Sequence, residues 1–271
     1  MKNKGRKLWT ASLIVGAISM AALYDRVKVV HYDIQHKLIE NPVRLVYLSD
    51  LHNNQYRDNQ SELKAHIIEL EPDLVLLGGD IFESKGPQDP TKDLLRWLGK
   101  HYTTYYVTGN HEYYTHRVIE LKQTVSQFGI TVLAGSTEQV TVGETKLAIS
   151  GIDDVVESHF YPQQLVEASE QLPTEPMYQL LLSHRPEYIE DYLPYEYDLI
   201  LSGHAHGGQW RIPGLINGVF SPGQGFFPQY AGGRYDFDLS TLIVSRGLSY
   251  QNQQVPRLFN RPEIVVINLI P

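Results

Sequence analysis

Five short apolar segments of the chain each end in side chains that can bind a divalent metal ion. Side chains two residues apart on an extended segment point the same way, so Asp50 and His52, or His204 and His206, can converge. The chain has no cysteine, which excludes a thiolate site and a thiol nucleophile. A donor set of nitrogen and oxygen without sulfur suits manganese, iron, zinc or nickel better than calcium or magnesium. The full set of metal-capable residues at the five segment ends is Asp50, His52, Asp80, Asn110, His111, His184, His204 and His206.

Each of these groups, taken alone, has an ordinary structural explanation. A single histidine after a strand is usually a surface or core residue, and a Gly-Asp pair is usually a turn or a helix cap. Unrelated turns do not explain five such groups, because α/β proteins place their ligand sites at the carboxyl ends of strands. Glycines next to several of the groups permit close backbone approach at a crowded site; they are Gly78, Gly79, Gly109 and Gly203. Six further histidines lack this context and are interpreted as structural: His31, His36, His66, His101, His116 and His159.

Apolar periodicity predicts strands that alternate with helices along most of the chain. Continuous apolar runs, such as residues 74–77, suit a sheet that is covered on both faces. This order predicts one α/β sandwich rather than two domains. Strands are expected at 27–35 (an edge strand), 43–49, 74–77, 105–107, 130–133, 140–142, 146–149, 178–182, 199–202, 241–244 and 263–269. Helices are expected at 59–70, 91–98, 118–128 and 162–172.

The charge of the chain is unevenly distributed. The net charge is −8, yet the first 28 residues hold six of the 23 basic residues and one of the 31 acidic residues. The remaining body is therefore strongly acidic, which argues against a nucleic-acid partner. Any recognition of phosphate must be local, and bound metal cations are one way to achieve it.

The N-terminal segment has the features of a targeting sequence. Residues 1–7 are basic and residues 8–24 carry no charge, a length between that of a signal peptide and that of a membrane-spanning helix. We expect residues 1–26 to be a signal anchor or a signal peptide, and residues 27–271 to be the catalytic domain. The basic flank predicts a cytoplasmic N-terminus, with the body on the outer side of the cell membrane. Cleavage near Ser19–Ala21 is the alternative, and it would yield a secreted protein.

The five motifs, in this order, resemble those of the calcineurin-like metallophosphoesterase family. The segments at residues 203–210, 244–248 and 256–269 are similar to those of a bacterial, membrane-associated or exported phosphodiesterase branch, and the resemblance covers about residues 27–270. It implies a four-layer α/β/β/α sandwich, preceded here by the hydrophobic N-terminal helix. The motifs stand in this sequence as Asp50-Leu51-His52, Gly79-Asp80, Gly109-Asn110-His111-Glu112, Ser183-His184 and Gly203-His204-Ala205-His206.

The resemblance also implies roles for individual residues. Asp80 would bridge two divalent metal ions, and His111 would be the catalytic histidine rather than a ligand. The remaining ligands would be Asp50, His52 and His206 for the first ion, and Asn110, His184 and His204 for the second. Two positions depart from the common family pattern: Glu83 stands where a second Asp often orients the histidine, and Ala205 stands where Thr is common.

These roles imply hydrolysis of a phosphoester by a hydroxide held between two metal ions, with manganese as the expected activator. His111 would stabilise developing charge or protonate the leaving oxygen. We expect a phosphodiesterase or pyrophosphatase acting on a lipid-linked or cell-envelope substrate. A phosphomonoesterase or protein phosphatase is one alternative, and a non-catalytic, metal-stabilised envelope-binding module is the other.

Residues that contact the substrate are harder to predict. Asn53 follows the first motif and Arg185 follows His184, so both are candidates for substrate binding, although Arg185 could equally pair with a surface carboxylate. An aromatic, glycine-rich stretch follows the last motif. It would form either a groove for a base, a sugar or an acyl chain, or a packed lid. Its aromatic residues are Trp210, Phe220, Phe226, Phe227 and Tyr230.

Overall fold

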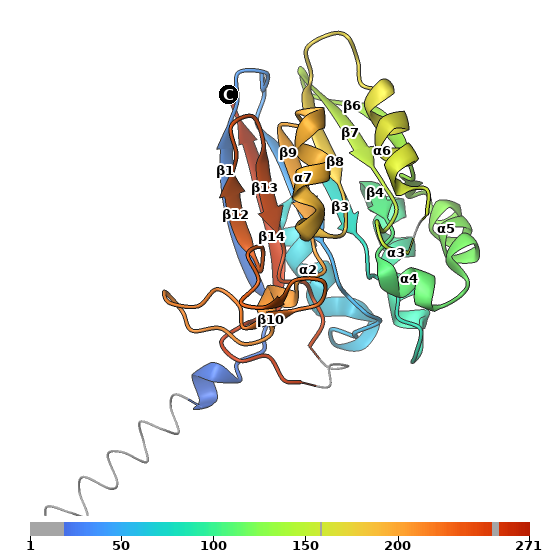
Figure 1. The fold of residues 1–271 in the computed structure, drawn as a ribbon. Coiled ribbons are helices and arrows are strands. Elements are labelled where there is room, and N and C mark those ends of the chain that lie inside the picture. Colours follow the sequence, from blue (N-terminus) through green and yellow to red (C-terminus); the bar gives the residue numbers. More distant parts are fainter. Residues whose placement is uncertain (1–18, 158, 251–254) are drawn as a thin grey trace, which may run out of the picture.

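The computed structural model describes residues 19–157, 159–250 and 255–271. Most of the predicted targeting segment lies outside the described residues, so its interpretation stays a prediction. Within the described ranges, no helix combines the length and the apolar composition that crossing a membrane requires. Two mixed β-sheets lie face to face with helices on their outer faces (Figure 1).

The first sheet has the strand order β1-β14-β2-β3-β4-β5. Its strands β2, β3, β4 and β5 are parallel, β14 is antiparallel to β2, and β1 is an edge strand paired with β14, as predicted. The strand bounds are β1 Lys28–Gln35, β2 Val43–Leu48, β3 Leu74–Gly78, β4 Thr103–Val107, β5 Thr131–Val132 and β14 Glu263–Ile270.

The second sheet has the strand order β12-β13-β9-β8-β7-β6, and β10 pairs with β11 in a separate two-stranded ribbon. Strands β13, β9, β8 and β7 are parallel, and the edge strands β12 and β6 are antiparallel to their neighbours. The strand bounds are β6 Ser136–Val142, β7 Thr145–Gly151, β8 Tyr178–Leu182, β9 Leu199–Ser202, β10 Phe220–Ser221, β11 Gly225–Phe226, β12 Gly233–Asp236 and β13 Thr241–Val244.

Three hydrophobic clusters define the layers of the fold. One lies between the first sheet and helices α2, α3 and α5, the second lies between the two sheets, and the third lies between the second sheet and helices α6 and α7. Alternation along β2 shows the cause, because Val46 and Leu48 face the first helix layer whereas Leu45 and Tyr47 face the other sheet. The predicted four-layer α/β/β/α sandwich is confirmed. The helices are α2 Ser61–Leu70, α3 Asp89–His101, α4 Asn110–Tyr114, α5 Val118–Gln127, α6 Tyr161–Glu170 and α7 Ile189–Tyr192, with short 3-10 helices at Asp58–Gln60, Pro186–Tyr188, Leu193–Tyr195 and His206–Gly208.

The differences from the predicted elements lie where apolar periodicity is weak. Helix α3 extends beyond 91–98, and β6 begins at Ser136 rather than at 140. The edge strand β12 was not predicted, since only one neighbour pairs with it and its side chains alternate between exposed and half-buried positions. The five-residue helix α4 is too short to show a helical repeat, and it carries two of the candidate site residues.

Candidate metal centre

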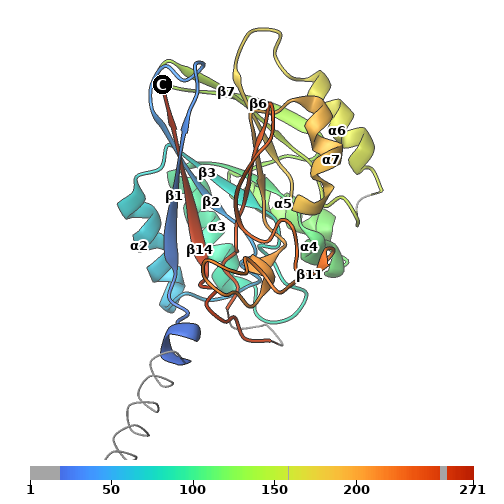
Figure 2. The same ribbon diagram turned by 60° about the vertical axis from the view of Figure 1, so that its left-hand side comes forward.

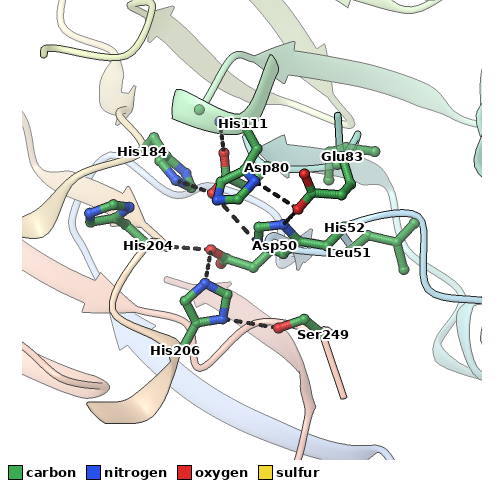
Figure 3. Close-up of polar contacts among 12 residues, drawn as sticks. Asp50, Leu51, His52, Asp80, Glu83, His111, His184, His204, His206 and Ser249 are labelled. Carbon is green, nitrogen blue, oxygen red and sulfur yellow. Dashed lines mark hydrogen bonds and ion pairs between the residues drawn. The ribbon is translucent and has the colours of Figure 1, made fainter. Parts of the chain in front are cut away.

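The predicted metal-capable residues come together at one edge of the sandwich. They follow the carboxyl ends of β2, β3 and β4 in the first sheet and of β8 and β9 in the second. Two contacts join the sheets here: the His204 backbone N–H donates to Asp50 Oδ1 at 2.9 Å, and His184 Nδ1 lies 2.7 Å from the Gly78 carbonyl oxygen. Parallel strands therefore deliver residues from five sequence positions to one point (Figure 3).

Among the described residues, ligand-capable atoms gather in three groups, of which two have Asp80 in common and the third is His52, Glu83 and His111. The Asp80 Oδ2 atom lies 3.6 Å from His52 Nε2 and 3.1 Å from His184 Nε2, so one carboxylate faces both groups. Within each group, one ligand atom from every residue lies within 4.8 Å of the others. The first group is Asp50, His52, Asp80 and His206, and the second is Asp80, His184 and His204.

The backbone at these positions is held in an uncommon conformation. Residues other than glycine rarely adopt a positive φ, because this backbone conformation is strained for them. Backbone strain of this kind concentrates at functional sites. Asp80 has φ 52° and His204 has φ 61°, each directly beyond the glycine that follows its strand. Six candidate site residues share this left-handed conformation: Asp50, His52, Asn53, Asp80, His204 and His206.

Two glycines make room for the carboxylates, as the sequence predicted. A Cβ atom at Gly109 would overlap Asp80 Oδ1, and a Cβ atom at Gly203 would overlap Asp50 Oδ2. A side chain at either position would therefore push a candidate ligand out of place.

Several buried polar atoms of the site have no hydrogen-bond partner among the described residues and could instead bind a metal ion. Asp50 Oδ2, Asp80 Oδ2 and Asn110 Oδ1 are buried acceptors without a hydrogen-bond partner. The Gly78 carbonyl only accepts, so His184 must donate through Nδ1, and its Nε2 is then the atom that faces Asp80. Buried acceptors without donors are unfavourable, and divalent cations between these atoms would satisfy them.

The pKa directions of His204 and His206 agree with this interpretation, whereas for His184 burial acts to lower the pKa but attraction to Asp80 outweighs it and raises the pKa to about 10. Burial lowers the pKa of His204 and His206 well below the usual value, with cationic neighbours adding to the effect, so both rings are neutral, which is the form in which histidine binds a metal. Burial raises the pKa of Asp50. Burial also acts to raise the pKa of Asp80, but attraction to His184 outweighs it and holds that pKa well below the usual range.

His111 is oriented by the acid that departs from the common family pattern. Glu83 Oε2 lies 2.7 Å from His111 Nδ1 and 3.2 Å from His52 Nδ1, so the longer carboxylate does reach the ring. Burial lowers the pKa of His111, but the Glu83 carboxylate outweighs this effect and the pKa is raised. The His111 ring lines both pockets that open from the site.

Glu112 is a site residue to which the sequence assigned no role. Its side chain is fully buried, and its two oxygens accept four backbone N–H groups at 2.8–2.9 Å, from Asp80, Ile81, Phe82 and Gly109. One carboxylate thus ties the loop after β3 to the start of α4. An acid three residues after the residue that precedes a helix is a known capping pattern, and this signal was present in the sequence.

The two predicted substrate contacts are both engaged by the protein. Arg185 Nε donates to Asp154 Oδ2 at 2.8 Å, while Nη1 lies 3.0 Å from His204 Nε2. Asn53 Nδ2 donates to the Glu83 carbonyl oxygen at 3.1 Å, and its Oδ1 accepts from Thr91 Oγ1 at 3.1 Å. Arg185 therefore lies at the site with its charge already paired, and Asn53 supports the Glu83 loop. Substrate binding by either residue stays a prediction.

Two pockets open from the site, and both are lined by His111, His206 and Pro222. One, of about 360 Å³, is polar and includes Asn110 and Arg185 in its walls. The other, of about 420 Å³, is mostly apolar. Three of the five predicted aromatic residues line it, namely Trp210, Phe220 and Phe226. Phe227 is exposed outside it, and Tyr230 is buried against Tyr235. The aromatic stretch thus forms a groove rather than a closed lid.

The calcineurin-like phosphoesterase family model matches residues 43–208, which contain all of these motifs. The chain belongs to this family, and the geometry and the match together define a metal-dependent phosphoester hydrolase. The fold agrees with that of the sulfate thiohydrolase SoxB of Thermus thermophilus, with a TM-score of 0.50 at 14% identity over 84% of this chain and 56% of that chain.

Two curated relatives are similar over most of the chain. The phosphodiesterase YaeI of Escherichia coli is 29% identical over 84% of this chain and 83% of its own length. A zebrafish (Danio rerio) protein described as a transmembrane protein with a metallophosphoesterase domain is 31% identical over 96% of this chain, which spans 61% of that protein.

Proposed function

We propose that this protein is a phosphodiesterase or pyrophosphatase with two divalent metal ions, of which manganese is the favoured activator. The observation that carries the proposal is the pair of ligand groups that meet at the Asp80 carboxylate. A carboxylate with two oxygens can hold two ions at the short separation that phosphoester hydrolysis uses. The similarity to a protein named as a phosphodiesterase supports the choice of reaction.

Each residue has a distinct part in this proposal. Asp50, His52 and His206 hold one ion, Asn110, His184 and His204 hold the other, and Asp80 holds both. When bound, the two ions neutralise the phosphoryl oxygens and activate a water molecule for in-line attack. His111, oriented by Glu83, presents a ring N–H to the leaving oxygen. Glu112 accepts hydrogen bonds from the backbone N–H groups of Asp80 and Gly109. It thereby holds the shared metal ligand Asp80 and the start of the helix that carries His111 in fixed relative positions.

We also propose that residues 1–26 attach the enzyme to the cell membrane and that residues 27–271 act on its outer side. The basic residues before the apolar run of the sequence support this orientation. An enzyme in this position acts on a lipid-linked or cell-envelope phosphoester.

An activity screen of the full-length protein tests the proposed function. The metal-stripped protein is loaded with Mn²⁺, Fe²⁺, Zn²⁺ or Ni²⁺ and assayed with bis-p-nitrophenyl phosphate and p-nitrophenyl phosphate. We expect turnover with Mn²⁺, a preference for the diester, and loss of activity in Asn110→Ala and His111→Ala. His116→Ala, outside the site, is the matched control. A preference for the monoester would indicate a phosphomonoesterase instead. Metal binding without any turnover would indicate a binding module.

A further inference from the structure

The apolar pocket starts at the candidate metal centre and ends on the surface of the molecule. Its inner wall is formed by site residues, among them His52, His111 and His206. Beyond them most of the described lining residues are apolar; they are Trp210, Val219, Phe220, Pro222, Phe226 and Val255, with Gln209 and Ser249 as polar members. A group that fills this pocket therefore lies next to the candidate metal centre.

The outer rim of this pocket exposes large apolar side chains to solvent. Phe226 is 74% exposed and Trp210 is 43% exposed, and on the same loop Leu215 is 79% exposed and Phe227 is 69% exposed. Monomeric soluble proteins rarely leave apolar groups of this size together on one surface unless the surface binds something. A hollow, apolar site of 300–1,000 Å³ is typical of ligand binding.

The end of the predicted membrane segment lies at this same rim. The Phe259 backbone N–H donates to the Ala22 carbonyl oxygen at 2.8 Å, and one residue earlier Leu258 forms a β-bridge with Trp210. The Arg261 guanidinium lies 4.7 Å from the centre of the Tyr24 ring, at the end of the apolar run of the sequence. Figures 1 and 2 show β10, β11 and the helical turn at residues 19–22 at one end of the molecule.

We propose that the apolar pocket binds the hydrocarbon chain of an amphiphilic phosphoester, whose phosphoryl group lies at the metal centre and whose polar group occupies the polar pocket. The inference rests on the phosphoesterase function proposed above and specifies its substrate class. A nucleobase or a sugar needs several hydrogen-bond partners, and among the described residues that line the pocket outside the metal-capable wall, Gln209 and Ser249 are the polar ones. A hydrocarbon chain needs none, and the exposed rim permits it to enter from a bilayer.

A chain-length series tests the proposal with the full-length protein in lipid nanodiscs. The substrates are p-nitrophenyl alkyl phosphodiesters with ethyl, butyl, hexyl and octyl groups, with p-nitrophenyl thymidine phosphate as the nucleoside counterpart. We expect kcat/KM to rise roughly threefold to fourfold for each methylene group that enters the pocket. Phe226→Asp should flatten this rise, whereas Ile119→Asp, an equally exposed apolar position outside the pocket, should keep it. Partition into the nanodisc is common to all variants, so their comparison isolates the pocket.

A binding measurement separates this inference from the proposed reaction. A monoalkyl phosphate with a brominated chain quenches tryptophan on contact, whether or not the protein hydrolyses it. In a Trp9→Phe background, quenching that is lost in Trp210→Phe and kept in Trp97→Phe would place the chain in the pocket. Such quenching without turnover of any ester would contradict the proposed function but would still support the assignment of the apolar pocket. The inference would be overturned by any of three results. These are turnover that does not depend on chain length, the same rise of kcat/KM with chain length in all variants, and faster turnover of the nucleoside diester.

Discussion

The two halves of the candidate metal centre share Asp80 but have different surroundings. The half around His184 and His204, which we call the closed half, borders the polar pocket and not the apolar one; both rings are almost completely buried, and Asp154 already neutralises the adjacent Arg185. Around His52 and His206 the site is open, since the same residues line the apolar pocket. In this open half the His111 side chain remains 29% exposed.

The difference assigns separate tasks to the two halves. In the closed half, charges are paired inside the protein, and removal of one partner leaves the other buried and uncompensated. In the open half, the pocket lining includes His111 and Glu83, the two residues to which we assign proton transfer and its orientation. Changes in the closed half should therefore affect stability and metal binding together, and changes in the open half should affect turnover with little effect on folding.

Substitution of the shared residue should have the largest effect. Asp80→Asn removes the charge that both ions would share, so we expect kcat/KM to fall by about 10³-fold or more. Metal analysis by mass spectrometry should show fewer than one ion per chain, against two in the unaltered protein. Asp58→Asn, at an exposed position, is the control. Two retained ions in Asp80→Asn would exclude a bridging role.

Substitution of Glu83 should have a smaller effect, confined to the open half. Glu83→Gln removes the carboxylate charge that orients His111, and loss of such an orienting group typically lowers activity by about 10- to 100-fold. We expect the loss in kcat, with the melting temperature and the metal content nearly unchanged. Glu83→Asp, which restores the commoner acid of the family, should retain more activity than Glu83→Gln. Equal losses in the two variants would show that the carboxylate does not act through His111.

The layers of the fold were predictable because each strand and helix carries a strong local pattern. The run at 74–77 is apolar throughout, and it forms β3, buried on both faces. Strand β12 was not predicted because it is an edge strand with partly exposed side chains. Its formation depends on pairing with β13. Its position is a property of the assembled sheet and not of its own sequence.

The metal-capable residues were predictable because each follows an apolar strand, and the topology of parallel strands brings such ends together. Most of the contacts that support them across the fold were not, although the spacing of Gly109 and Glu112 did carry a capping signal. Asp154 and Arg185 are 31 positions apart, and Glu112 reaches the loop after β3 from another strand end. Contacts of this kind depend on distances between loops, which no spacing in the sequence reveals. The same holds for the two pockets, whose walls come from both sheets.

Disruption of the buried pair in the closed half should have the smallest effect on turnover and a clear effect on stability. Arg185→Met leaves the Asp154 carboxylate buried without its partner, at a cost of about 3 kcal/mol in the free energy of unfolding. For a chain of this size this corresponds to a fall in melting temperature of roughly 6–12 °C, measurable by calorimetry. Adding Asp154→Asn should recover part of the loss, because the amide removes the unpaired charge and its Oδ1 can still accept from Val156 and Glu157.

An exposed pair provides the matched control for this last comparison. Arg234 pairs with Asp236 at the surface, where such an interaction contributes roughly 0–1 kcal/mol, so Arg234→Met should leave the melting temperature almost unchanged. The kinetic result then decides the part of Arg185. If its guanidinium mainly balances Asp154, the Michaelis constant of Arg185→Met rises less than about tenfold, since the lost interaction is within the protein. A Michaelis constant raised about 100-fold or more without loss of stability would instead identify Arg185 as a phosphate ligand, and the closed half would then take part in substrate binding.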